Sequence, residues 1–186
     1  MPASLMINGL VLVISAGLWI ACFHGNAWLM SFASHAAGIS LVFLPAGLRL
    51  LALLVGGGWA AGGIAMGAML CMSAEFPDMG LAQAATISLV AGFAPYLSLL
   101  AACRALGIEG SLSNLGAAHL PVMALAISAG SAAAHNLVFA SFGITNWQDF
   151  GQNFAAMATG DFIGCLVAVT LAIAALRVWR IAARLA

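Results

Sequence analysis

Long apolar runs separated by short polar breaks make up almost the whole chain. Each run is close to the roughly 20 residues that a helix needs to cross a bilayer core. Only 5% of the residues are charged, whereas soluble domains carry about 25%, so the chain lacks the polar surface of a soluble fold. The sequence predicts an all-α polytopic membrane protein, a six-helix bundle forming one transmembrane domain over residues 1–186. The expected spans are 5–23, 27–46, 50–73, 81–105, 118–142 and 154–178, followed by a basic tail at 179–186.

The charged residues indicate an orientation for these six spans. If both termini are cytoplasmic, every arginine falls on the cytoplasmic side, accompanied by one acid, Glu109, while Glu75, Asp78 and Asp149 fall on the other side. This distribution follows the positive-inside rule. The sequence therefore predicts a multi-pass protein of a bacterial inner membrane, with both termini in the cytoplasm. The arginines that set the topology, and that could contact a partner, are Arg49, Arg104, Arg177, Arg180 and Arg184.

The two ends of the chain add two expectations. Residues 1–4 carry no basic charge and the apolar run 5–23 is long enough to span, so we expect a retained first helix in place of a cleaved signal peptide. The basic tail is expected to lie against the anionic inner leaflet and to offer a contact for a cytoplasmic protein partner. The chain contains no lysine, so no basic stripe is present that would bind nucleic acid.

Small residues at helical spacing indicate close helix packing. Gly58 with Gly62, and Gly63 with Gly67, are small-xxx-small pairs that let helix backbones approach one another. The expected span 118–142 repeats the pattern with alanine and serine. We expect the spans 50–73 and 118–142 to form the tight centre of the bundle.

A few polar residues inside the spans are the candidates for binding chemistry, because polar groups in hydrocarbon are costly. In the six-span arrangement, His35, His135, Asn136 and Asp161 all fall in the outer half of the membrane. They predict a polar pocket, open to the outside, for a small ligand, a proton or a metal. Asp161 and His135 are expected at similar depth on neighbouring antiparallel helices, facing one another. The alternative is that these two residues only hold the helices together.

No pattern of catalysis is present, and none of a dedicated metal site. The chain lacks an HExxH, a GxSxG or a phosphate-binding loop, and its four cysteines match no zinc or redox spacing. We therefore expect no enzyme, no catalytic residue and no resident metal. A haem or chlorin ring at His35 or His135 is a further alternative, because a serine lies one helical turn before each histidine.

Several segments resemble the MASE1 domain, an integral membrane sensor module of bacterial signalling proteins. Residues 43–47 read F-L-P-A-G, glycines follow at 56–58 before Trp59, and residues 159–164 read T-G-D-F-I-G. These segments are similar to the W-P-P-x-G, W-P and W-x-G-D-x-x-G motifs of the family, and residues 88–107 resemble its long fourth helix. The resemblance covers about residues 35–175 in the same order. It departs from the pattern at Phe43 and Leu44, where the family has Trp-Pro, and at Ala60, where the family has proline.

The resemblance implies a sensor of a small ligand, or an accessory subunit that acts on a partner protein. Family members carry a cytoplasmic output domain, whereas this chain ends shortly after its last expected span, so its signal would pass to a separate protein or to another copy of itself. One alternative is a small-solute transporter, or a substrate-binding subunit similar to those of energy-coupling-factor transporters. Another is a structural or pigment-associated subunit of a larger membrane complex.

Overall fold

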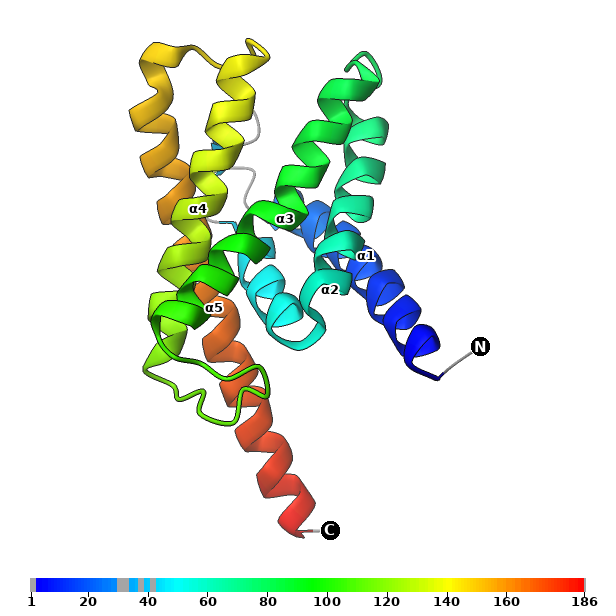
Figure 1. Ribbon diagram of the computed structural model, residues 1–186, viewed down its shortest axis with the longest axis vertical. Helices are drawn as coiled ribbons and strands as arrows, with labels where there is room; N and C mark the ends of the chain where they lie inside the picture. Colours follow the sequence, from blue (N-terminus) through cyan, green and yellow to red (C-terminus); the bar gives the residue numbers. More distant parts are fainter. Residues whose placement is uncertain (1–2, 30–33, 37–38, 41–42, 186) are drawn as a thin grey trace.

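The fold is a bundle of long helices (Figure 1). The computed structural model describes residues 3–29, 34–36, 39–40 and 43–185. The helices are α1 (Ala3–Leu29), α2 (Pro45–Glu75), α3 (Leu81–Ala105), α4 (His119–Ser141) and α5 (Phe150–Leu185), with a short 3-10 helix, η2, at Trp147–Asp149. Two short antiparallel strands, β1 (Ser34–Ala36) and β2 (Ile39–Ser40), lie between α1 and α2.

Five helices within the described residues are long and apolar enough to cross a membrane. This confirms the helical membrane class but not the count of six. The expected span 27–46 is wrong, because α1 continues to Leu29, β1 and β2 follow, and α2 begins at Pro45. Proline suits the first turn of a helix, where its missing N–H is not needed. Asn26, expected in a turn, lies inside α1, and its side-chain oxygen accepts a hydrogen bond from the Leu44 backbone N–H at 2.9 Å.

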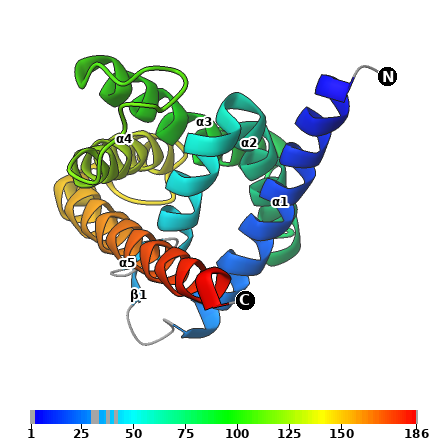
Figure 2. The same cartoon turned by 90° about the horizontal axis from the view of Figure 1, so that it is seen from below.

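Helix α2 consists of two helical segments that meet at Gly57. The backbone there has φ 52° and ψ −134°, a conformation that only glycine adopts without strain. Figure 1 shows the two segments, cyan and teal, meeting at a sharp bend. From below, the first segment lies between α1 and α5 (Figure 2). The bend therefore gives α2 one segment directed at α5 and another that packs against α1.

The second segment of α2 packs tightly on α1 and α3. A side chain at Gly63 would overlap the backbone carbonyl of Leu12 in α1, and one at Gly67 would overlap that of Ala16. Gly58 and Gly62 make no comparably close contact. The expected spans 50–73 and 118–142 correspond to α2 and α4, the two most buried of the long helices, as expected for the centre of the bundle. They have few contacts with one another, because Gly63 and Gly67 of α2 face α1, while α4 packs between α3 and α5.

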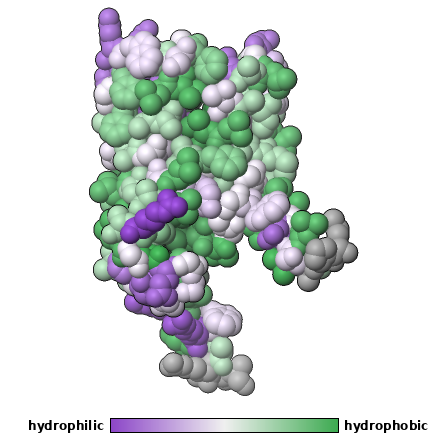
Figure 3. All heavy atoms as spheres, in the orientation of Figure 1, coloured by the Kyte–Doolittle hydropathy of each residue, from purple (hydrophilic) through white to green (hydrophobic). Residues whose placement is uncertain are grey.

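The outer surface suits a bilayer. Large apolar side chains are exposed along the helices, among them Val13, Val55, Leu97 and Leu171. Figure 3 shows apolar residues over the middle of the molecule and hydrophilic ones toward its two ends. Both termini lie in the lower half of Figure 1, while the turns after α2 and α4 lie at the top.

Candidate functional site

A buried ion pair lies at the centre of the bundle. Arg49, in the first segment of α2, donates a hydrogen bond from Nη2 to Oδ2 of Asp161 in α5 at 2.6 Å, and both side chains are 1% exposed. The guanidinium also lies 5.8 Å from the centre of the Trp19 ring, a cation–π arrangement. The prediction that Arg49 lies in a cytoplasmic turn and sets the topology is therefore wrong, because its charge is neutralised inside the protein.

Close backbone contacts hold this ion pair in place. The Phe43 N–H donates to the Gly160 carbonyl oxygen at 3.1 Å. A side chain at Gly164 would overlap the Phe43 carbonyl, and one at Gly47 would overlap Gly164 itself. Because α2 and α5 touch backbone to backbone on both sides of the pair, Arg49 reaches Asp161 with little freedom to move away.

Helix α4 supplies the other predicted site residues. His135 is 6% exposed, and its Nδ1 lies 2.9 Å from the carbonyl oxygen of Ser131 and 3.4 Å from the Ser131 hydroxyl. Asn136 is fully buried and donates to the Ala132 carbonyl at 2.8 Å. Helices α4 and α5 are antiparallel neighbours, as expected (Figure 1). The prediction that Asp161 faces His135 is wrong, because Arg49 occupies the position beside the Asp161 carboxylate.

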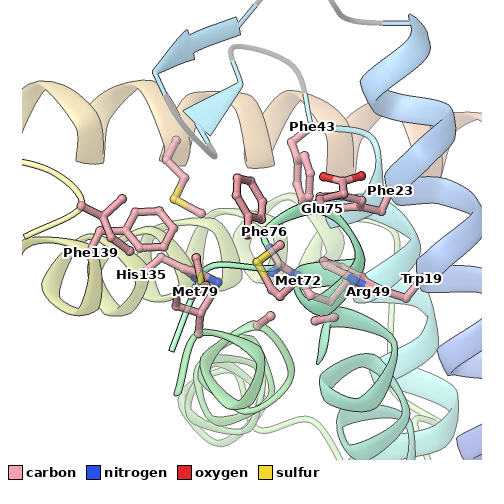
Figure 4. Close-up of a pocket in the computed structure, with 15 residues that line it drawn as sticks. Trp19, Phe23, Phe43, Arg49, Met72, Glu75, Phe76, Met79, His135 and Phe139 are labelled. Atoms are coloured by element: carbon pink, nitrogen blue, oxygen red, sulfur yellow. The ribbon is translucent and has the colours of Figure 1, made fainter. Parts of the chain in front are cut away.

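Arg49 and His135 both line one cavity of about 260 Å³. Figure 4 shows Arg49 beside Trp19 at one end of the cavity, and His135 beside Phe139 at the other. Aromatic rings and methionines form most of the wall between them. The aromatic and methionine lining residues are Trp19, Phe23, Phe43, Phe76, Phe139, Met72, Met79 and Met157.

The ends of α1 and α2 bring an imidazole and a carboxylate together at the rim of the cavity. Glu75, the last residue of α2, lines the cavity, and its carboxylate lies 3.2 Å from Nδ1 of His24 in α1. Both side chains are partly exposed, at 35% and 51%. Ile144 also lines the cavity, and it follows a helix-ending turn in which its N–H donates to the Phe139 carbonyl at 2.8 Å. The cavity therefore reaches the end of the bundle that carries the turns after α2 and α4.

Several buried polar atoms near this centre have no hydrogen-bond partner among the described residues. They are Arg49 Nε, Trp19 Nε1, Asp161 Oδ1, Ser128 Oγ and Asn136 Oδ1. Buried polar groups are normally paired. The buried residues around Arg49 and Asp161 therefore have donors and acceptors that the ion pair does not use.

The remaining predicted residues lie elsewhere. His35 belongs to β1, and its side chain is outside the described part of the structure. Arg104 is in the last turn of α3. Arg177 and Arg180 are exposed near the end of α5, whereas the side chain of Arg184 is not described. Of the other three residues expected in one polar pocket with His35, only His135 lines the cavity, which is built by α1 to α4 with one residue of α5; Asn136 and Asp161 are buried outside its lining.

The structure also bears on the predictions about metals and cofactors. In the described ranges, no three His, Cys, Asp or Glu side chains gather as metal ligands. A haem or chlorin at His135 stays a prediction. Because Nδ1 of that ring is engaged with Ser131, ligation would fall to Nε2.

Sequence reasoning missed the roles of Arg49, Trp19 and Glu75. A signal for Arg49 was present, since it stands inside the run G-L-R-L-L-A-L-L, with apolar neighbours on both sides. An arginine in such a run needs a partner in the membrane, and Asp161 was the single acid placed inside a span. No protein family, no curated protein and no solved structure matches the chain.

Proposed function

We propose that the chain is a non-enzymatic membrane module that binds a small molecule in the cavity above the Arg49–Asp161 pair. The cavity carries the proposal, because an apolar space with a few convergent polar groups is the usual form of a small-molecule site. In this proposal, binding is sensed, and the chain serves as the input or accessory subunit of a partner protein.

The orientation belongs to the same proposal. Without Arg49, the arginines at 104, 177, 180 and 184 still lie toward one end of the bundle, and Glu75, Asp78 and Asp149 toward the other (Figure 1). The positive-inside rule then predicts both termini in the cytoplasm of a bacterial cell, with the cavity open to the outside. Five helices are compatible with this orientation because α2 turns back at Gly57, so that its two segments run in opposite directions (Figure 1). The exposed Arg177 and Arg180 would face the inner leaflet or a partner protein.

The resemblance to the MASE1 family gains support from one contact. The two segments that carry it, residues 43–47 and 159–164, are far apart in sequence but pack directly on one another. Their contact also positions Arg49 and Asp161. The motif pair thus surrounds the ion pair, and its Phe43 also lines the cavity.

The test is recovery of a bound molecule from the purified protein. Ala91 is 4% exposed and lines the cavity, so Ala91→Leu fills part of the space. Ala101→Leu makes the same change on the exposed side of the same helix. Native mass spectrometry in mild detergent should find a small molecule on the wild type and on Ala101→Leu, and much less on Ala91→Leu. Equal recovery from all three proteins would count against the cavity.

A second candidate function, transport of a small solute, is favoured by the break in α2. Discontinuous helices with irregular backbone at a central site are typical of secondary transporters, and Gly57 interrupts α2 in this way. Reconstitution into sealed vesicles separates the two functions. A transporter accumulates the bound molecule inside the vesicles, whereas a sensing module binds it without accumulation.

A further inference from the structure

Three methionines and one histidine line the cavity together and form a candidate set of metal ligands. Met72 lies in the last turn of α2, Met79 in the turn after α2, Met157 in α5 and His135 in α4. Thioether ligands favour Cu⁺, and imidazole also suits copper. Resting on the proposed function, which leaves the bound molecule unnamed, we infer that the cavity binds a soft monovalent metal ion of the Cu⁺ type.

The three methionines pack together. Met157 belongs to a buried cluster with Phe139, and Met72 and Met79 pack against that cluster. Methionine supplies 9 of the 186 residues of the chain but 3 of the 15 that line the cavity, so its general abundance does not explain its concentration here. Figure 4 shows the thioether groups of Met72 and Met79 among the lining side chains. Because methionine is unbranched and flexible, its sulfur can move to meet an ion that is smaller than the cavity.

His135 is held in the form that binds a metal. Its Nδ1 lies 2.9 Å from the carbonyl oxygen of Ser131. A carbonyl oxygen can only accept, so Nδ1 carries the hydrogen and, in the neutral ring, Nε2 carries the lone pair. No hydrogen bond among the described residues uses Nε2. Histidines that bind metals usually donate their other ring N–H to a carbonyl or carboxylate in this way.

Asn136 holds one of the sulfur atoms near this histidine. Its Nδ2 lies 3.7 Å from the sulfur of Met157. Met157 is in α5, so the contact places a thioether from α5 against the residue that follows His135 in α4. A thioether sulfur accepts hydrogen bonds only weakly, so the contact orients Met157 without preventing its sulfur from binding a metal.

The charge on the cavity wall suits one positive ion. Among the lining residues, Arg49 and Glu75 carry formal charges, and the Arg49 charge is neutralised by Asp161 at 2.6 Å. Glu75 therefore leaves the wall with a negative charge whenever His24, at 3.2 Å, is neutral. A monovalent cation balances that charge. A divalent cation would leave positive charge in a mostly apolar space, which is costly.

The ligand set also disfavours hard metals. Within the described ranges, no three His, Cys, Asp or Glu side chains are grouped to hold a metal. Ca²⁺ and Mg²⁺ require oxygen ligands, and zinc sites are built from thiolate, imidazole and carboxylate. On the cavity wall, Glu75 and His135 are the residues of these kinds. Thioethers must supply the remaining ligands, and this favours Cu⁺ over the harder ions.

The first experiment uses Ag⁺, a soft monovalent ion that, unlike Cu⁺, needs no reductant. The full chain, labelled with ¹³C at the methionine methyl groups, is titrated with Ag⁺ in detergent micelles and chloride-free buffer, and followed by NMR. The partly exposed thiols of Cys22 and Cys103 are replaced by alanine, because thiols also bind soft ions. We expect the methyl signals of Met72, Met79 and Met157 to shift together and to saturate at about one Ag⁺ per chain.

Single substitutions locate the site. Exchange of methionine for leucine conserves volume and is usually tolerated. Met72→Leu, Met157→Leu and His135→Gln should each weaken Cu⁺ binding about tenfold or more, because even residues that only support metal ligands contribute about 10–100-fold. Cu⁺ affinity is measured by competition with bathocuproine disulfonate, a coloured chelator, under anaerobic reducing conditions. Met66 is 44% exposed on α2, outside the cavity lining, so Met66→Leu should leave the affinity unchanged.

Each contrary result has one meaning. If the Met66 signal shifts as much as that of Met157, or if equimolar Zn²⁺ displaces Ag⁺, the soft-metal site is wrong. If neither Ag⁺ nor Cu⁺ binds, but a molecule co-purifies with the wild type and is lost from Ala91→Leu, the ion is wrong and the binding function stands. If neither ion binds and Ala91→Leu recovers the same molecules as the wild type, the proposed function fails as well.

Discussion

The two segments of α2 differ in one of the contacts that hold them in the bundle. The first, residues 45–56, carries a charge and pairs with α5 through Arg49 and Asp161. The second, residues 58–75, carries glycines and packs against the α1 backbone at Gly63 and Gly67. Apolar burial gives helices in lipid little reason to associate, so contact must come from close packing or from polar pairing. The first segment uses both solutions, because Gly47 also packs closely on α5, whereas the second relies on close packing.

The difference shows where the molecule can respond to a ligand. Close glycine packing depends on shape alone and is insensitive to what fills a neighbouring cavity. A buried ion pair depends on its polar surroundings, and Arg49 lines the cavity. We therefore expect a ligand to act mainly through the ion pair that joins the first segment of α2 to α5, although α1 and the second segment also line the cavity.

The largest expected effect comes from breaking the charged contact. Arg49→Ala leaves the Asp161 carboxylate buried without its partner, which costs about 3–5 kcal/mol. The free energy of unfolding, measured by SDS titration in mixed micelles, should fall by that amount. Replacing both residues, Arg49→Met with Asp161→Leu, should recover most of the loss, because neither charge remains.

A matched control identifies the cause of that loss. Arg177 is exposed near the end of α5, so Arg177→Ala should change the free energy of unfolding by less than about 0.5 kcal/mol. Equal effects of Arg49→Ala and Arg177→Ala would show that the ion pair contributes nothing to the first segment.

A smaller effect is expected in the glycine-packed segment. Gly63→Val places a side chain against the Leu12 backbone, and overpacking of this kind costs about 1–3 kcal/mol. At Gly62, its neighbour on the same helix, an added Cβ would lie 3.9 Å from the nearest Leu12 side-chain atom, an ordinary contact. Gly62→Val should therefore be tolerated in the same SDS titration. If Gly62→Val is as harmful as Gly63→Val, the close contact with α1 is not what holds this segment.

The sequence predicted the segments whose structure is set locally. The expected span 81–105 coincides with α3, and 118–142 exceeds α4 by one residue at each end, because apolar runs between polar turns determine such helices. The run 27–46 is also apolar, but hydropathy alone does not distinguish a spanning helix from other backbone. Strands β1 and β2 and the start of α2 at Pro45 replace the expected span there.

The site was predictable only in part, for a related reason. His135, Asn136 and Asp161 were expected from their polarity inside apolar runs, and all three are buried. The partner of Asp161 was not predicted. Arg49 lies 112 residues away in the chain, and no local pattern specifies so distant a contact. Charge sorting assigned Arg49 to the cytoplasm, since it stood at the end of a span that does not form.

The smallest expected effect lies at the junction of the two segments and has opposite signs at neighbouring residues. Gly57 has a positive φ of 52°, where a Cβ costs about 1–2 kcal/mol, so Gly57→Ala should destabilise the protein in the SDS titration. Gly58 is helical, and its added Cβ would lie 3.6 Å from the Tyr96 hydroxyl, an ordinary contact. Gly58→Ala should then be neutral or stabilising by up to about 1 kcal/mol, as expected for alanine replacing glycine within a helix.

A straight α2 would make the two variants behave alike, because both residues would then be helical. The sign difference between adjacent glycines therefore measures whether the bend that separates the two segments exists in the membrane.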